Sequence, residues 1–382
     1  MKKHLFPLSL RQVLTLIIVS CTLNTHAQET SLKEAFRDYW LMGVAVNERQ
    51  DSGLCPKETE LIRRNFNSVT AENCMKCEVI HPYEHIFDFT LADQFVDNAI
   101  ANGQHIVGHC LIWHSQCAPW FFIDENGNDV SPEELRKRMK EHIFTIMAHF
   151  RGRVKAWDVV NEPIEDNGSY RKTGFYRILG KEYIKLAFQY AHEADPDAEL
   201  YIQDYSMAVK PRYEEYVRLV NEMIGEGLRV DGIGLQGHLM LDSSPAADYD
   251  KAITALATTG VKLMVTELEC SALPNPYADG NSSAEISDRF AYRPEMDPYR
   301  EGLPKNVIKQ WENRYLDFFK VLLKHRDVID RVTFWGLNDD NSWRNSSPIP
   351  GRKDYPLLFD RNNKPKPLYY KLIELAGKYS SK

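Results

Sequence analysis

The sequence predicts a single α/β domain with the fold of a (β/α)8 TIM barrel. Short apolar runs rich in β-branched residues alternate eight times with amphipathic segments of helical period. The apolar runs are hydrophobic along most of their length, which is typical of parallel strands covered on both faces. No glycine-rich dinucleotide motif or phosphate-binding loop follows any of these runs, so a doubly wound nucleotide-binding sheet is not favoured.

The apolar runs and the periodic segments between them give the expected order of elements. Strands are expected at Leu41–Val46, Asn67–Ala71, His105–Ile112, Val154–Val160, Glu199–Gln203, Gly232–Gln236, Lys262–Thr266 and Arg331–Gly336. Helices are expected at Lys57–Phe66, Leu91–Asn102, Pro132–Phe150, Tyr176–Ala194, Pro211–Gly225, Ala247–Thr258, Asn306–His325 and Leu368–Tyr379. Ser131 and Glu134 have the spacing of a capping box at the start of the third helix.

The first 27 residues have the pattern of a secretory signal peptide. Basic residues precede an apolar run over residues 13–23, which is too short to span a membrane. Ala27 ends a small-residue cleavage pattern, so the barrel domain is expected at 28–382. A bacterial lipobox ending at Cys21 is the alternative and would give a lipid-anchored outer-membrane form. Both interpretations predict export, to the periplasm or out of the cell, without a transmembrane span.

The composition is that of an ordinary globular protein and excludes several classes of function. The chain has 47 Lys and Arg against 54 Asp and Glu, a net charge of −7, so a nucleic-acid partner is not expected. The cysteines beyond the signal are too sparse for a disulfide scaffold, and the lone Cys74–Cys77 C-x-x-C lacks the second ligand pair of a zinc site. We expect a monomer with no metal and no cofactor.

Polar and aromatic residues gather at the carboxyl ends of the expected strands, where TIM barrels carry their active sites. They are Glu72, Asn73, His109, Trp113, His114, Gln116, Asn161, Glu162, Gln236, His238, Glu267, Glu269, Trp335, Asn338, Asp339 and Trp343. Two opposed carboxylates are the minimal equipment for glycoside hydrolysis. Amides and imidazoles suit hydroxyl recognition, and indoles stack on sugar rings. The rim therefore favours carbohydrate chemistry over hydride or phosphoryl transfer.

Five sequence blocks, in order along the chain, identify a family. They are Gly108–Gln116 (GHCLIWHSQ), Trp157–Pro163 (WDVVNEP), Gly234–His238 (GLQGH), Val265–Glu269 (VTELE) and Thr333–Asp339 (TFWGLND). Together they resemble blocks of family 10 glycoside hydrolases, the endo-β-1,4-xylanases. The resemblance covers about Trp40 to Tyr370, essentially the whole expected mature chain.

The resemblance implies a retaining mechanism with Glu162 as general acid/base and Glu267 as nucleophile. Retention implies carboxyl groups about 5–5.5 Å apart and requires no metal. The acid must stay protonated at the working pH, while donors such as His238 and Asn161 would keep Glu267 ionised or hold the sugar 2-hydroxyl.

The remaining matched positions imply a binding site for xylan and xylo-oligosaccharides. The glycone side would be bound by Glu72, Asn73 and Lys76, and the wall of the cleavage subsite would be formed by His109, Trp113 and Gln116. The hydroxyl donor and the hydrophobic platform would be supplied by Gln236, Trp335 and Trp343. The acceptor side would be contacted by Tyr205. Crowding by the indoles would favour a pentose over a hexose that carries a hydroxymethyl group.

The chain departs from the family pattern at several positions. Lys76 is followed by Cys77 where the family usually has Trp, so one aromatic surface is missing, and Cys74, Cys110 and Cys117 also stand where cysteine is unusual. The strand-five block is 203–206 (QDYS), in place of two asparagines around Asp-Tyr, which bears on acceptor-side contacts. A long Cys270–Leu303 connection follows the nucleophile strand and could lengthen one end of the cleft.

Three other functions remain open at this point. One is a barrel glycosidase that prefers β-1,4-glucan or aryl β-glycosides, and another is a xylan-binding protein without turnover. The third is a metal-dependent hydrolase that uses His109, His114 and His238, although neither an H-x-H nor an H-E-x-x-H motif supports it.

Overall fold

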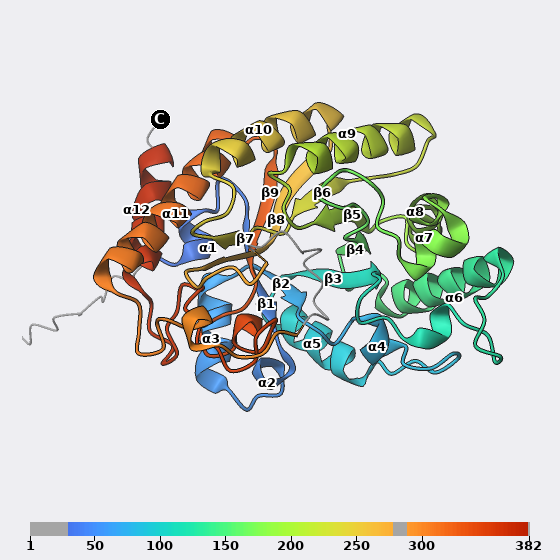
Figure 1. Ribbon diagram of the computed structural model, residues 1–382, viewed down its shortest axis with the longest axis horizontal. Helices are drawn as coiled ribbons and strands as arrows, with labels where there is room; N and C mark the ends of the chain where they lie inside the picture. Colours follow the sequence, from blue (N-terminus) through green and yellow to red (C-terminus); the bar gives the residue numbers. More distant parts are fainter. Residues whose placement is uncertain (1–29, 278–288, 381–382) are drawn as a thin grey trace, which may run out of the picture. The chain divides into compact units, whose positions relative to one another are not determined.

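The computed structural model describes residues 30–277 and 289–380. The expected signal peptide over 1–27, and Cys21 within it, lie outside the described residues. From Ser31 onward these residues form a (β/α)8 barrel, in which a central ring of parallel strands is surrounded by helices (Figure 1). The predicted fold class is therefore confirmed.

Eight parallel strands close the barrel. They are β1 (Leu41–Val46), β2 (Ser68–Ala71), β3 (His105–Ile112), β4 (Ala156–Asn161), β5 (Glu199–Asp204), β6 (Gly232–Leu235), β8 (Lys262–Ser271) and β9 (Ile329–Phe334). Each strand pairs in parallel with its neighbours, β1 with β9, and a β6–β8 pairing completes the ring. Every carboxyl end therefore lies on one rim of the barrel.

The strand that carries Glu267 is longer than predicted. Strand β8 continues to Ser271, five residues beyond the expected Thr266, because its buried side chains continue through Leu268 and Cys270. The added length pairs with β7 (His238–Met240), a three-residue strand that the sequence reading missed. The connection after this strand was predicted to begin at Cys270, and that boundary was wrong. The connection begins only after Ser271.

The helices that cover the strands lie close to the predicted ranges. They are α3 (Pro56–Asn65), α5 (Thr90–Ala101), α6 (Pro132–Phe150), α8 (Glu182–Ala194), α9 (Lys210–Gly225), α10 (Ala246–Leu256), α11 (Lys305–Lys324) and α12 (Pro367–Ser380). Shorter helices are α1 (Leu32–Ala35), α2 (Glu48–Asp51), α4 (Cys77–Ile80) and α7 (Gly174–Leu179), with 3-10 turns at Pro119–Phe121, Ala257–Thr259, Pro294–Met296 and Trp343–Asn345. Within the described residues, no helix is long and apolar enough to cross a membrane.

Two local predictions about helices need correction. The single helix expected over Tyr176–Ala194 is two helices, α7 and α8, because Gly180 adopts a left-handed φ of +60° between them. At the start of α6, Ser131 Oγ accepts the Glu134 backbone N–H at 3.1 Å, so half of the capping box forms. The Glu134 carboxylate pairs with Lys137 and Arg138 instead of turning back to the cap.

The core occupies two layers. A large apolar layer lies between strands and helices, and a smaller cluster of Val107, Ala156, Tyr201 and Met264 fills the barrel interior. Gly108 on β3 pairs with Trp157 on β4, and a Cβ at residue 108 would come within 2.1 Å of the indole ring. Glycine at this position therefore lets Trp157 pack, which supports the strand that directly precedes Glu162.

Candidate active site

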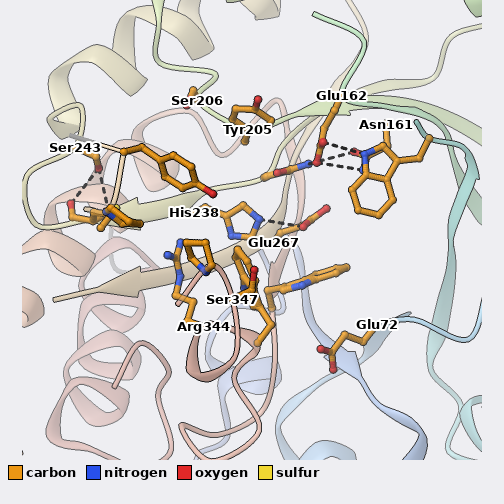
Figure 2. A pocket seen from close by; sticks show the side chains of 18 of the residues that line it. Glu72, Asn161, Glu162, Tyr205, Ser206, His238, Ser243, Glu267, Arg344 and Ser347 are labelled. Atoms are coloured by element: carbon orange, nitrogen blue, oxygen red, sulfur yellow. Dashed lines mark hydrogen bonds and ion pairs between the residues drawn. The ribbon is translucent and has the colours of Figure 1, made fainter. Parts of the chain in front are cut away.

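An open cleft of about 280 Å³ lies at the carboxyl ends of the strands (Figure 2). Its lining includes every predicted site residue except Gln116, namely Glu72, Asn73, Lys76, His109, Trp113, Asn161, Glu162, Tyr205, Gln236, His238, Glu267, Trp335 and Trp343. Gln116 lines an adjoining hollow that shares Glu72, Asn73 and Trp343 with the cleft. The predicted residues therefore do come together in space.

Glu162 follows β4 directly and extends its carboxyl group into the cleft. Its φ of +56° is uncommon outside glycine and costs on the order of 1 kcal/mol. Its Oε2 accepts the Trp113 indole N–H at 2.9 Å, and its Oε1 accepts from Gln236 Nε2 at 2.9 Å. The two donors orient the carboxyl group from opposite sides.

Glu267 lies on β8 and is only 5% exposed. Its Oε2 lies 3.1 Å from His238 Nε2, and its Oε1 accepts from Gln203 Nε2 at 3.2 Å. Figure 2 shows its carboxyl group directed into the same space as that of Glu162. Each carboxylate oxygen therefore has a polar partner, and these two contacts hold the Glu267 side chain at a fixed orientation.

His238 connects two carboxylates through its two ring nitrogens. Nδ1 lies 2.8 Å from Glu269 Oε1, opposite the Nε2 contact with Glu267. Burial alone would lower the pKa of His238, but the hydrogen bonds and charges of the two carboxylates outweigh it and raise the pKa to about 9. At neutral pH the ring is therefore an imidazolium that donates from both nitrogens.

Glu269 is the buried anchor of this arrangement. Its Oε1 accepts from Trp343 Nε1 at 2.8 Å and from Arg344 Nε at 2.6 Å, in addition to His238. Burial would raise the pKa of Glu269, but Arg344 and these hydrogen bonds lower it below the ordinary value. Glu269 therefore stays ionised and holds His238 toward Glu267.

Gln203 is a site residue whose contact the sequence reading missed. Because residue 203 departs from the family pattern, the sequence suggested a change in acceptor-side contacts. In the structure, its Nε2 donates to Glu267 Oε1 and also lies 3.0 Å from Asp158 Oδ2. Thr266 donates to its Oε1. The alternation of side chains along a strand could have predicted this position. Tyr201, two residues earlier, lies in the barrel interior, and residue 203 lies on the same face of the strand.

The end of the cleft that is predicted to bind the glycone is built around Lys76. Its Nζ donates to Asn73 Oδ1 at 3.0 Å and to Gln116 Oε1 at 2.8 Å, and it lies 5.1 Å from the centre of the Trp113 ring. Burial raises the pKa of the neighbouring Glu72 to about 7, against the opposing charge of Lys76. This end presents amide, ammonium and carboxyl groups, which are the groups that bind sugar hydroxyls.

Aromatic rings form another part of the wall of the cleft. The Trp335 ring lies 5.2 Å from that of His109, edge to face, and the Trp343 ring lies 5.5 Å from that of His238. His109 Nδ1 is oriented by Asp158 Oδ2 at 2.9 Å. The lining also includes residues that the sequence reading did not select, Asp166, Ser206, Met240, Ser243, Asn275, Pro276, Tyr277, Arg344, Ser347 and Pro348.

Besides Gln116 and the fully buried Glu269, three residues of the predicted rim do not line the cleft. Asn338 donates to Glu58 and Asn363, Asp339 pairs with Lys366, and His114 packs beside Trp113. Asn338 and Asp339 hold the loop after β9 in place. Within residues 30–277 and 289–380, no three His, Cys, Asp or Glu side chains are grouped so that they could hold a metal ion.

Comparisons with known proteins agree with this geometry. The sequence profile of glycosyl hydrolase family 10 matches residues 31–375. Endo-1,4-beta-xylanase A of Xylanibacter ruminicola is 45% identical over 347 residues, 91% of this chain and 94% of that protein. The beta-1,4-xylanase of Dictyoglomus thermophilum is 35% identical over 370 residues, 95% and 97% of the two chains.

Solved structures give the same result. A GH10 endoxylanase retrieved from a sugarcane soil metagenome superimposes with a TM-score of 0.86 and 41% identity, covering 90% of this chain and 100% of the other. The xylanase XynB of Paenibacillus barcinonensis, complexed with a conduramine derivative, gives a TM-score of 0.80 and 35% identity over 91% and 98%. The barrel, the paired carboxylates at its rim and these matches place the chain in glycosyl hydrolase family 10.

Proposed function

We propose that the protein is an endo-acting β-1,4-xylanase that cleaves internal bonds of xylan with retention of anomeric configuration. The observation that carries the proposal is that Glu162 and Glu267 reach one open cleft from β4 and β8, each with its own set of donors. Xylan as substrate follows from the relatives, which are named xylanases. We propose a carboxyl separation of about 5–5.5 Å, the range for retaining enzymes.

In the first step, protonated Glu162 donates its proton to the glycosidic oxygen while a Glu267 oxygen attacks the anomeric carbon. The bond to the leaving group breaks, and a glycosyl ester with Glu267 forms. His238 and Gln203 hold Glu267 as an oriented anion before attack. Trp113 and Gln236 hold the Glu162 carboxyl group beside the departing oxygen.

In the second step, Glu162 acts as the base. It removes a proton from water, the water oxygen attacks the anomeric carbon, and the ester to Glu267 breaks. Once the ester has formed, Glu267 no longer carries a negative charge beside Glu162. Two inversions at the same carbon retain the β configuration.

The wall of the cleft supports a preference for pentoses. Trp335 and Trp343 flank the His109 and His238 region where the reacting ring would lie. Ring stacking accommodates the flat face of a xylose, while a hydroxymethyl group at C5 would meet the indoles. A β-1,4-glucan therefore binds less well than xylan.

We also propose that the protein is exported through the signal pattern at 1–27 and acts on xylan as a monomer. Amino-terminal sequencing of the mature protein tests the first point. A start at Gln28 supports cleavage after Ala27, and a lipidated Cys21 supports the anchored alternative. Light scattering of the purified chain tests the second.

The experiment that tests the function is a timed digest of linear xylan, with proton NMR of the newly formed anomeric signals. Early β-configured products of mixed length support an endo-acting retaining xylanase. Initial α-products would contradict the two-carboxylate assignment, and faster release from soluble cellulose would favour the glucanase alternative. Xylan binding without products would favour a binding protein, and loss of activity on chelation would favour the metal-dependent alternative.

A further inference from the structure

Two cysteine sulfurs meet beside the glycone end of the cleft. Cys77 begins α4 and is buried, while Cys117 follows β3 and is half-buried. Their Sγ atoms lie 3.7 Å apart as free thiols, with Cys117 donating to Cys77. Neither residue lines the cleft, so the sugar-binding groups described above do not account for this pair.

The backbone already holds the two segments side by side. The Glu78 N–H donates to the Gln116 carbonyl at 3.0 Å, so a main-chain hydrogen bond joins the residues next to the two cysteines. A disulfide needs an S–S distance of about 2.05 Å and neighbouring backbones. To form the bond, the two sulfurs, now 3.7 Å apart, must approach each other by side-chain rotation.

We propose that Cys77 and Cys117 are a cross-linking site that forms an intrachain disulfide when a low-molecular-weight disulfide acts as oxidant. The half-buried Cys117 thiolate attacks the oxidant, releases one small thiol and forms a mixed disulfide. Cys77, after losing its proton, attacks the Cys117 sulfur and releases the second small thiol. Two cysteine thiols are oxidised, one small disulfide is reduced to two thiols, and the protein loses two hydrogen atoms.

The other described cysteines are placed differently. Cys55 is half-buried at the start of α3, with its Sγ 3.7 Å from Nη2 of Arg49, and Cys74, Cys110 and Cys270 are buried. The contact with Cys77 and burial raise the pKa of Cys117 well above its ordinary value. Oxidation should therefore be slow at neutral pH and faster as the pH rises.

The cross-link would restrain the residues that bind the glycone. Lys76 and Gln116 immediately precede the two cysteines and bond to each other at 2.8 Å. Gln116 has a φ of +44°, a conformation that residues other than glycine rarely adopt. A disulfide next to it would hold Gln116 and Lys76 in their paired geometry. This effect on sugar binding rests on the proposed function, whereas the cross-link itself does not.

Peptide mapping tests the cross-link directly. The folded protein is incubated with oxidised glutathione at mildly alkaline pH, alkylated under denaturing conditions, digested without reductant and analysed by mass spectrometry. We expect one dominant linked peptide pair containing Cys77 and Cys117, lost in Cys117→Ser and in Cys77→Ser and retained in the control Cys55→Ser. Alkylation of both thiols after prolonged oxidation, or a dominant link to another cysteine, would overturn the proposal.

Thermal unfolding and ligand binding test its consequence. Oxidation should raise Tm by roughly a few degrees in the unmodified chain and in Cys55→Ser. It should leave the Tm of Cys117→Ser unchanged. In a Glu267→Ala background, which prevents turnover, the oxidised form should bind xylotriose roughly twofold to fivefold more tightly in calorimetry. An unchanged Kd with the linked peptide present would refute the effect on the glycone end.

Peptide mapping and calorimetry distinguish failure of the cross-link from failure of the proposed function. If neither form binds xylotriose but the linked peptide is present, the proposed function fails and the cross-link stands. If xylotriose binds but the linked peptide does not form, the cross-link fails and the proposed function stands.

Discussion

Gln203 Nε2 donates to Oε1 of Glu267 at 3.2 Å, which joins the interior of β5 to the proposed nucleophile on β8. The same amide group is held by Thr266 on one side and lies beside Asp158 on the other. Gln203 therefore acts as a positioning residue for Glu267, and it does so from a position where the family pattern has asparagine.

The variant Gln203→Met should lower kcat about tenfold and leave KM for xylan nearly unchanged, because methionine keeps the volume but removes the donor. Steady-state kinetics on xylan and on an aryl xyloside measure the split. Gln203→Asn is the matched control, because it keeps an amide of the family type and should be less impaired. Equal kcat for Gln203→Met and the unmodified protein would remove Gln203 from the catalytic arrangement.

Loss of the proposed nucleophile should abolish turnover on every substrate. Glu267→Ala removes the group that forms the covalent intermediate, so kcat should fall by at least about 10⁴-fold on xylan and aryl xylosides alike. Circular dichroism and xylotriose binding control for folding. Residual turnover near the unmodified rate would place the nucleophile elsewhere.

Loss of the proposed acid should depend on the leaving group. Glu162→Ala should reduce cleavage of xylan by about 10²–10⁴-fold, because its alkoxide leaving group needs a proton. Aryl xylosides with acidic phenols need little protonation and should form the glycosyl-enzyme at nearly the original rate. Burst kinetics on a nitrophenyl xyloside provide the measurement, and equal losses on both substrate types would contradict the assignment.

The raised pKa of His238 predicts a loss of stability at alkaline pH. Its folded-state pKa of about 9 exceeds the ordinary 6.5, so the folded protein binds the proton more tightly than the unfolded chain. The stabilisation is complete below about pH 6.5, and it is lost as the pH rises through about 9. Denaturant unfolding across this window should show a loss of a few kcal/mol.

A direct titration separates His238 from other alkaline groups. Nitrogen NMR of the histidine rings should show one imidazolium that persists to about pH 9. Glu269→Gln should lower that pKa toward the ordinary value, because it removes one of the two carboxylates that raise it. A His238 ring that is neutral at pH 7 would contradict the proposed double donation.

Gly108→Ala should destabilise the protein by about 2–3 kcal/mol through overpacking. Its Cβ would lie 2.1 Å from the Trp157 ring, so β3 and β4 would have to separate. Gly225→Ala is the matched control, because a Cβ there meets nothing within 4 Å at the end of α9. Urea unfolding should show the first variant weakened and the second within about 1 kcal/mol of the original.

Much of the fold could be predicted from sequence because local patterns agree with the barrel. The expected ranges of β1, β3 and α6 coincide residue for residue with the structure. The short strand β7 could not be predicted, because three residues carry too little periodicity and its pairing depends on the extended β8.

The position of a site residue could be predicted where it depends on the end of one strand. It was harder to predict where hydrogen bonds to residues remote in sequence decide where the side chain lies. Glu162 and Glu267 lie at the cleft as expected. Asn338 and Asp339 also follow a strand, but bonds to Glu58 and Lys366 direct them into the supporting loop. These partners are remote in sequence, so no local pattern identifies them.

The pairing of β7 with the extended β8 has a consequence for engineering. Glu267 and Glu269 lie on one strand and His238 on its neighbour, so their spacing is set by a backbone ladder. The connection after Ser271 supplies Asn275, Pro276 and Tyr277 to the cleft, so we expect that exchanging it with those of relatives changes the preferred oligosaccharide length. The rate of bond cleavage should survive such grafts, because Glu267, the proposed nucleophile, is oriented by His238 on β7 and Gln203 on β5.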